Sequence, residues 1–261
     1  MDEQIVLFEV RDHVAHVTLN RPAVLNAINP PLYEALTAAM TRFRDDPDLW
    51  VAILTGAGDR AFSAGADLKW RASHESEVKA GASTMMRGGF VSPRFQCWKP
   101  IIAAVNGYAV GGGLELALAC DVIVAAEHAQ FGLPEPRRGL MAGAGGVHRL
   151  LRQVPWKLAM GLILTGKLIS AAEAYRIGLV NEVVAKADLS AAVDRWVSDI
   201  LAGAPLAVQA SKQSALDGAD WPLEIAMSRS YPLQQELRES EDLLEGPRAF
   251  AAKRKPVWTG H

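Results

Sequence analysis

Two glutamates in strongly apolar surroundings are the residues of this sequence whose types and spacing could do chemistry. Glu115 follows three consecutive glycines, Gly111–Gly113, and Glu135 stands further along in the sequence FGLPE. Buried carboxylates are costly, and proteins seldom keep them without a partner or a task. A glycine-rich helix start also leaves backbone N–H groups unpaired at the positive end of the helix dipole. The pattern indicates acid/base chemistry on a carbonyl compound.

Each glutamate taken singly also has a purely structural interpretation. Glu115 could be an acid in the first turn of a helix, where the dipole favours it. Glu135 could form an ion pair in a loop, with Arg137 or Arg138. The presence of both acids beside two turns of small residues favours catalysis.

The second turn of small residues is FSAGAD, at Phe62–Asp67, which follows a strand-like run. One N–H from this turn and one from Gly111–Gly113 could together hold a carbonyl oxygen as it becomes an enolate. A phosphate-binding loop is not indicated, because neither cluster fits GxxxxGK[ST] or GxGxxG.

Composition narrows the function classes. Half of the 261 residues are hydrophobic, which predicts a folded chain with a sizeable core. The 27 basic and 29 acidic residues give a net charge of −2, so neither nucleic acid nor a membrane surface is an expected partner. Polar residues within the apolar stretch 101–126 argue against a membrane span, and the acidic N-terminal stretch lacks the layout of a signal peptide.

Cysteine and histidine usage indicates neither a metal site nor a disulfide. Cys97 and Cys120 lie in apolar contexts without a CxxC or CxxH spacing, which predicts buried free thiols. The six histidines include no HExxH or HxH pair. We therefore predict a cytoplasmic protein without a bound metal.

Hydrophobic periodicity predicts an α/β fold. Runs rich in β-branched residues predict strands at 5–10, 14–19, 50–55, 101–105 and 122–125, and a helix should begin at Pro30 with Asn29 as its N-cap. The strands are buried runs typical of a parallel sheet with intervening helices. Beyond residue 190 further helices are predicted at 206–216, 223–237 and 240–253. We expect a core over residues 1–190 and a helical part over 191–261.

The segment 73–93 reads as an irregular helix and loop. Its Met85 and Met86 are interpreted as ordinary core filling or as a pliable wall for an acyl group.

Several motifs in order and at family spacing resemble the enoyl-CoA hydratase/isomerase (crotonase) superfamily. The similar stretches cover nearly the whole chain: NRPAVLNAI (20–28), AFSAGADLK (61–69), KPIIAAVNGYAVGGGLELALACD (99–121), FGLPEPRRGLMAGAGGVHRL (131–150), LTGKLISAAEAYRIGLVNEVV (164–184) and AFAAKRKPVW (249–258). The resemblance implies a crotonase (ClpP-like) spiral of ββα units with a helical C-terminal part used for trimer contacts. Members are usually trimers or dimers of trimers.

The resemblance also implies roles for individual residues. The catalytic group would be the two acids, two oxyanion-hole N–H donors and a glycine near the catalytic water: Glu115, Glu135, Ala64, Gly112 and Gly143. The residues contacting coenzyme A would be Ala66, Lys69, Phe250 and Lys253. The last two commonly reach the ligand across a subunit boundary.

The activity implied is reversible hydration of an enoyl-CoA thioester in fatty acid metabolism, with no cofactor beyond the coenzyme A that the substrate carries. We expect Glu115 to act mainly on water and Glu135 mainly at C2. Two departures from the family pattern leave the acyl group open. Ala142 stands where many short-chain hydratases carry proline, and the sequence around Gly88–Phe90 looks like carnitinyl-CoA dehydratases. Double-bond isomerisation, thioester hydrolysis and a non-catalytic acyl-CoA-binding role are further functions compatible with the sequence.

Overall fold

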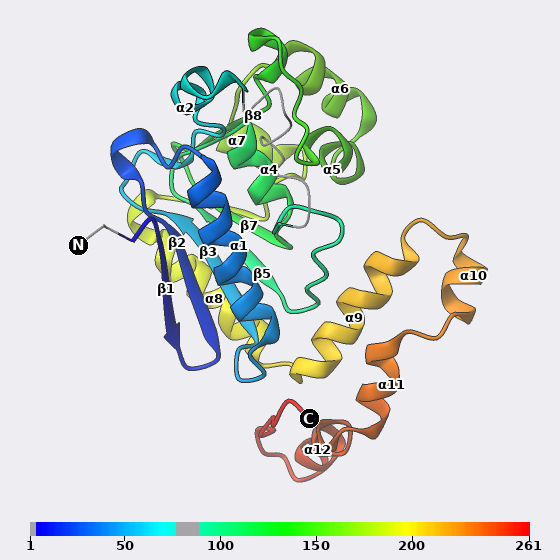
Figure 1. The fold of residues 1–261 in the computed structure, drawn as a ribbon. Coiled ribbons are helices and arrows are strands. Elements are labelled where there is room, and N and C mark those ends of the chain that lie inside the picture. Colours follow the sequence, from blue (N-terminus) through cyan, green and yellow to red (C-terminus); the bar gives the residue numbers. More distant parts are fainter. Residues whose placement is uncertain (1–3, 77–88) are drawn as a thin grey trace.

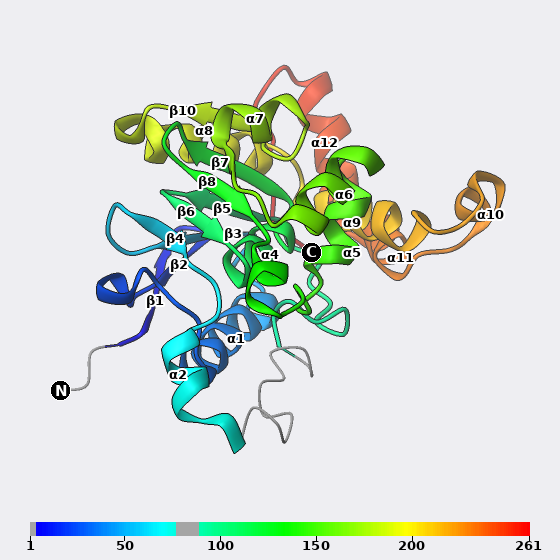
Figure 2. The same ribbon diagram turned by 90° about the horizontal axis from the view of Figure 1, so that it is seen from above.

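The computed structural model describes residues 4–76 and 89–261. The chain builds two sheets beside one another, with helices on their outer faces and a helical arm at the C-terminal end (Figures 1 and 2). The α/β class predicted from periodicity is therefore confirmed. Met85 and Met86, interpreted as core filling or as a wall for an acyl group, and Gly88 lie outside the described residues.

The larger sheet has six strands in the order β1-β2-β3-β5-β7-β10. The strands are β1 (Val6–Arg11), β2 (Val14–Leu19), β3 (Val51–Gly56), β5 (Ile101–Val105), β7 (Val122–Ala126) and β10 (Glu182–Val184). Only the β1–β2 pair is antiparallel, and each of the other pairs in this sheet is parallel. The five predicted strand runs correspond to the first five of these strands.

Side chains alternate between two cores across this sheet, as the two-residue period of a strand requires. On one face Ala15 and Val17 pack with apolar residues of α1 (Pro30–Asp45). On the other face Val14 packs with apolar residues of α8 (Leu189–Leu201). Helix α1 begins as predicted, since the Asn29 side chain accepts a hydrogen bond from Leu32 N at 3.1 Å.

The smaller sheet has four short strands in the order β4-β6-β8-β9. They are β4 (Ala61–Ser63), β6 (Tyr108–Val110), β8 (Gln130–Gly132) and β9 (Ile169–Ser170). The first three run parallel, and β9 is antiparallel to β8. These strands were not among the predicted ones, because runs of two or three residues carry almost no periodic signal.

Short helices lie in the segments that connect the strands of the core. They are η1 (Pro22–Val24), α2 (Leu68–Ser73), α4 (Gly112–Leu118), η2 (Glu135–Arg138), α5 (Gly146–Gln153), α6 (Trp156–Thr165), α7 (Ala171–Arg176) and η3 (Lys186–Asp188). Among the described residues, no helix is both long and apolar enough to cross a membrane.

The C-terminal arm consists of α9 (Pro205–Gly218), α10 (Leu223–Ser228), α11 (Pro232–Glu239) and α12 (Glu241–Ala251). Figure 1 shows these helices, coloured yellow to red, extending away from the sheets. Lys212 of α9 ties the arm to the core through a hydrogen bond to Asp121 Oδ2 at 2.6 Å. The predicted single helix over 223–237 is wrong, because Pro232 starts a new helix and holds the preceding residue in an extended conformation. The predicted division at residue 190 runs through α8.

Candidate active site

Three loops meet at one edge of the smaller sheet. Because β4, β6 and β8 are parallel neighbours, their carboxyl ends lie side by side. The loop after β4 is the turn 64–67, the loop after β6 is Gly111, and the loop after β8 leads directly to Glu135. The carboxyl ends of parallel strands are where open α/β sheets bind ligands. The topology thus gathers the elements that the sequence separates by many residues.

Glu115 is held at the junction of two helices. It lies in α4 and is 4% exposed, and its Oε1 accepts a hydrogen bond of 2.9 Å from the N–H of Gly146. Gly146 is the first residue of α5, so the carboxylate sits at the positive end of that helix. The contact needs glycine, since a Cβ on Gly146 would stand 2.9 Å from Glu115 Cγ. Glu115 therefore has one fixed oxygen.

Burial raises the pKa of Glu115 to about 7, and the nearby Glu135 charge pushes in the same direction. The backbone N–H groups of Gly146 and Ala144 and the charge of Arg149 oppose this rise by favouring the carboxylate. A carboxyl whose pKa lies near neutrality can both accept and return a proton at physiological pH.

Glu135 is held more loosely. It opens η2, and Gly111 packs against its carboxylate so closely that a Cβ there would stand 2.8 Å from Glu135 Oε1. Its other oxygen, Oε2, is buried and has no hydrogen-bond partner among the described residues. Burial raises the pKa of Glu135, while the charge of Arg138 lowers it. The alternative interpretation of Glu135, an ion pair with Arg137 or Arg138, is not seen among the described residues, and Arg137 Nε instead donates to Thr165 O at 2.7 Å.

The prediction that Ala64 donates its N–H to an oxyanion is wrong. Ala64 N donates to Leu25 O at 2.9 Å, because the segment 25–28 runs alongside residues 63–67. In the same pairing, the N–H of Asp67 donates a hydrogen bond to Ile28 O at 2.9 Å. An amide already bonded inside the fold cannot also bind a substrate oxygen without losing that bond.

The backbone N–H groups of Ala66 and Gly112 are the ones that remain available to bind a substrate oxygen. Neither has a hydrogen-bond acceptor in the described ranges 4–76 and 89–261. They are neighbours, since a Cβ on Gly112 would lie 3.6 Å from the Ala66 nitrogen. Gly65 makes the approach possible: its φ is +82°, and a Cβ there would lie 2.9 Å from Gly112 N. The pair forms a candidate oxyanion hole, with Gly112 as predicted and Ala66 in place of Ala64.

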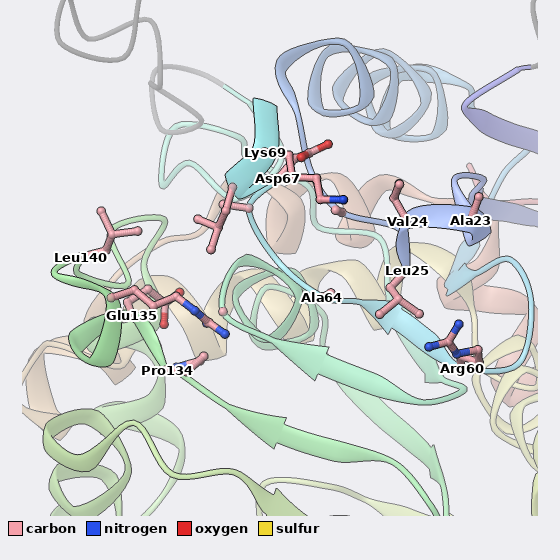
Figure 3. Close-up of a pocket in the computed structure, with 15 residues that line it drawn as sticks. Ala23, Val24, Leu25, Arg60, Ala64, Asp67, Lys69, Pro134, Glu135 and Leu140 are labelled. Atoms are coloured by element: carbon pink, nitrogen blue, oxygen red, sulfur yellow. The ribbon is translucent and has the colours of Figure 1, made fainter. Parts of the chain in front are cut away.

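A pocket of about 410 Å³ opens beside these loops, between the segment 23–27 and η2 (Figure 3). Its walls include Ala66, Gly111 and Glu135, and its polar lining includes the exposed cations Arg60, Lys69 and Arg138. Two of the residues predicted to contact coenzyme A, Ala66 and Lys69, thus line the pocket.

The remaining predicted residues lie elsewhere or lack a direct contact. Phe250 is 87% exposed on α12, and Lys253 follows that helix; Figure 1 shows α12 far from α2 and β8. Neither residue reaches the pocket of its own chain. Gly143 lies in the turn before α5, the turn whose Ala144 and Gly146 stabilise the Glu115 carboxylate.

Two residues of this site escaped the sequence analysis. Gly146, which binds Glu115, lies within the quoted stretch MAGAGGVHRL, where it looked like one more loop glycine. Arg149 follows it in the same helix and acts electrostatically on Glu115. The cue available was the glycine pair at a helix start, which marks free N–H groups that attract an anion.

A family model described as enoyl-CoA hydratase/isomerase matches residues 9–261. Among curated proteins, an (E)-benzylidenesuccinyl-CoA hydratase of Thauera aromatica is 45% identical over 256 residues, which cover 98% of this chain and 99% of the relative. A carnitinyl-CoA dehydratase of Salmonella typhi is 43% identical over 256 residues, covering 95% of each chain. Hydratases and dehydratases are both hydro-lyases.

The solved structures similar to this chain include enzymes of the same family. An enoyl-CoA hydratase of Mycobacterium marinum superposes with a TM-score of 0.90 at 42% identity, covering 99% of this chain and all of the other. An enoyl-CoA hydratase of Bacillus anthracis reaches 0.92 at 37% identity, with the same coverage. The predicted crotonase fold is thereby confirmed.

Proposed function

Since the chain belongs to the enoyl-CoA hydratase/isomerase family and is an enzyme of that family, we propose that it adds water reversibly across the 2,3 double bond of an enoyl-CoA thioester. One observation carries the proposal. Two acids with raised pKa values converge where three parallel strands end, beside two backbone N–H groups that have no acceptor among the described residues. Hydration of a conjugated thioester needs these parts: a base, an acid and donors for the developing oxyanion.

The chemistry divides among these groups. The thioester oxygen accepts hydrogen bonds from the N–H groups of Ala66 and Gly112, and charge moves onto it as an enolate forms. Glu115 takes a proton from water while the water oxygen bonds to C3. Glu135, in its protonated form, gives a proton to C2, and the enolate returns to a thioester. The sum is one water added: Glu115 ends protonated and Glu135 ionised, and a proton passes back from Glu115 to Glu135 before the next turnover.

The raised pKa values support this division. Glu115 titrates near neutrality, so a large part of it is ionised and able to accept a proton at pH 7. The free, buried Oε2 of Glu135 can carry a proton without breaking a hydrogen bond to any described residue. We propose that Gly143, in the turn beside Glu115, helps to leave space for the water.

The pocket lining supports a coenzyme A thioester as the substrate. Arg60, Lys69 and Arg138 supply positive charge at the pocket, which suits the phosphates of that carrier. No further cofactor enters the proposed reaction. A cytoplasmic location and a place in fatty acid metabolism remain predictions.

A second candidate is a hydratase or dehydratase acting on a larger or substituted acyl group. The observation that favours it is that the two curated relatives described above are named for benzylidenesuccinyl-CoA and carnitinyl-CoA rather than for a simple chain. The same acids and N–H groups would serve this substrate, because the reacting atoms are unchanged.

Turnover of crotonyl-CoA by the purified protein tests the proposal. We expect loss of the conjugated thioester absorbance with 3-hydroxyacyl-CoA as product. Benzylidenesuccinyl-CoA and carnitinyl-CoA, assayed in parallel by product mass, separate the two candidates through their kcat/KM values. Absence of water addition or removal with all three substrates, in a folded protein that binds coenzyme A, would exclude both. A product of unchanged mass with a shifted double bond would instead identify an isomerase.

We also propose that the chain works as a homotrimer or a dimer of trimers. The C-terminal arm leaves large apolar side chains exposed, including Trp221, Leu223, Ile225 and Met227. An exposed apolar surface of this kind is typical of an interface. Assembly could also bring Phe250 and Lys253 to the coenzyme A of a neighbour. Light scattering after gel filtration should give three or six times the 28.1 kDa of one chain, and a monomer would contradict the proposal.

A further inference from the structure

A single arginine links the turn beside Glu115 to a segment that is distant in sequence. Arg149 of α5 donates from Nη2 to Val91 O at 2.7 Å and from Nη1 to Ala144 O at 3.2 Å. Gly145, before the helix, has a φ of +101°, and a Cβ there would collide with Arg149 Nη1. The fork of the guanidinium is therefore fitted against the turn that binds Glu115.

The other segment, which contains Gly89 and Val91, is held from a second side. Val91 N donates to the hydroxyl of the buried Tyr33 on α1 at 3.4 Å. Gly89 packs flat against the same ring, since a Cβ on it would overlap the Tyr33 side chain. The backbone at Val91 is thus pinned between α1 and α5, with Arg149 as the contact on the α5 side.

Among the described residues, the charge of Arg149 has no close carboxylate. Its hydrogen bonds go to two neutral carbonyls, and within the described part of the chain no acid lies within 4.0 Å of its guanidinium. The groups that act on it electrostatically are Glu115 of α4, Cys120 in the turn after that helix and Tyr33 of α1, with Glu115 the strongest. This half-buried cation therefore has its main electrostatic partner in the proposed base.

We propose that Arg149 is a positioning residue for Glu115, holding the turn that binds the carboxylate and supplying the positive charge that keeps it ionised. The inference rests on the proposed function, in which Glu115 takes the proton from water. The geometry explains why an arginine stands here: only a planar fork reaches both carbonyls while remaining charged.

An infrared titration of the Glu115 carboxyl tests this directly, with the protonated-carboxyl band assigned by its loss in E115Q. In R149Q we expect the Glu115 pKa to rise by about half a pH unit, less than for a carboxyl that loses an opposite charge in direct contact, because Arg149 acts on Glu115 more weakly than the Gly146 N–H and the Glu135 charge do. The ionised fraction at pH 6, and with it kcat for crotonyl-CoA, should fall about threefold. R149K, which keeps the charge, should restore most of the titration.

R152Q is the matched control, since Arg152 is exposed one turn further along α5 and binds only His148 O at 3.2 Å among the described residues, apart from a distant Asp220 contact at 4.0 Å. It should leave both the titration and kcat unchanged. If R149Q does not fold by circular dichroism, R149M, which keeps an unbranched apolar stem, takes its place. An unshifted Glu115 titration in a folded neutral variant, or equal shifts in R149K and R149Q, would overturn the proposal. Failure of the wild-type protein to hydrate any substrate would instead remove the proposed function and leave the titration result valid.

Discussion

The junction of α4 with α5 and the loop at η2 each present one acid, and they hold it differently. At the junction, Glu115 is nearly enclosed and one of its oxygens is bound by the first N–H of α5. In the loop, Glu135 is only half-buried, yet its Oε2 has no partner among the described residues. A bound carboxylate is suited to positioning a water molecule, whereas an unbound oxygen is suited to carrying a proton to and from carbon.

Removing each carboxyl should have the largest effect. E115Q and E135Q should each lower kcat for enoyl-CoA hydration by about 10²–10⁴-fold, because general acid and general base groups contribute this much. The double variant should be little worse than the poorer single one, since the two groups act in one step. Solvent-proton exchange at C2 of the 3-hydroxyacyl-CoA sharpens the comparison. It should be lost in E135Q more completely than in E115Q, and the reverse order would exchange the two roles.

The buried acid should also destabilise the protein above neutral pH. The pKa of Glu115 is about 7 in the folded chain against an ordinary value of 4.5, so the folded state binds more protons between these pH values. The free energy of unfolding therefore falls as pH rises through this window, by about 3 kcal/mol from this one group. In E115Q the side chain at this position does not titrate, so this fall in the free energy of unfolding should be absent.

Urea unfolding at pH 5 and pH 8 measures the difference. The advantage of E115Q over wild type should be larger at pH 8 than at pH 5, and E135Q should show a smaller change because Glu135 is less buried. Equal pH slopes in wild type and E115Q would mean that Glu115 is not the titrating group.

The two supporting glycines offer a way to disturb each acid separately. G146A places a Cβ 2.9 Å from Glu115 Cγ, and G111A places one 2.8 Å from Glu135 Oε1 on a backbone with φ +58°. Each should lower kcat on the order of 10²-fold, as expected for a misplacement of about 1 Å. G161A is the control, because no atom of another described residue is found within 4 Å of its Cβ position. Full activity in G146A would show that the Gly146 contact does not position Glu115.

The smallest effect is expected at the rim of the loop. Arg138 is exposed and its charge lowers the pKa of Glu135, so R138Q should raise that pKa by a few tenths of a pH unit. High salt should erase the difference, since the charge is screened by solvent. R137Q, whose side chain binds Thr165 O, should leave the pH profile of kcat unchanged. A large, salt-independent effect of R138Q would mean that the loop acid depends on a closer contact.

The sequence was sufficient to single out the two acids as candidates and to predict the fold class. Glu115 and Glu135 stand in local motifs, and the five long strands have a periodic pattern of their own. The sequence was not sufficient to predict which N–H group of the FSAGAD turn is free to act as an oxyanion donor. Whether Ala64 or Ala66 keeps a free N–H depends on the pairing of this turn with Leu25 and Ile28, which are distant in sequence. Such pairing is fixed by tertiary register, and a shift of one residue exchanges bonded and free amides.

The short strands of the smaller sheet illustrate the same limit. Two- and three-residue strands become visible only when neighbouring strands supply their hydrogen bonds. The arm shows the opposite case, because here a local signal was available. Pro232 indicates a break in the helix, whereas the periodic pattern of 223–237 predicts one continuous helix.

The candidate oxyanion hole is made from the main chain, and this has a consequence for mutational change. No substitution at Ala66 or Gly112, other than proline, deletes the N–H that each contributes, so ordinary point mutation alters the acids far more readily than the hole. A lineage carrying this scaffold can exchange Glu115 or Glu135 and explore other reactions of thioesters while retaining the means to stabilise an enolate. Amide-to-ester replacement by semisynthesis, rather than mutagenesis, is the chemical change that addresses these two donors.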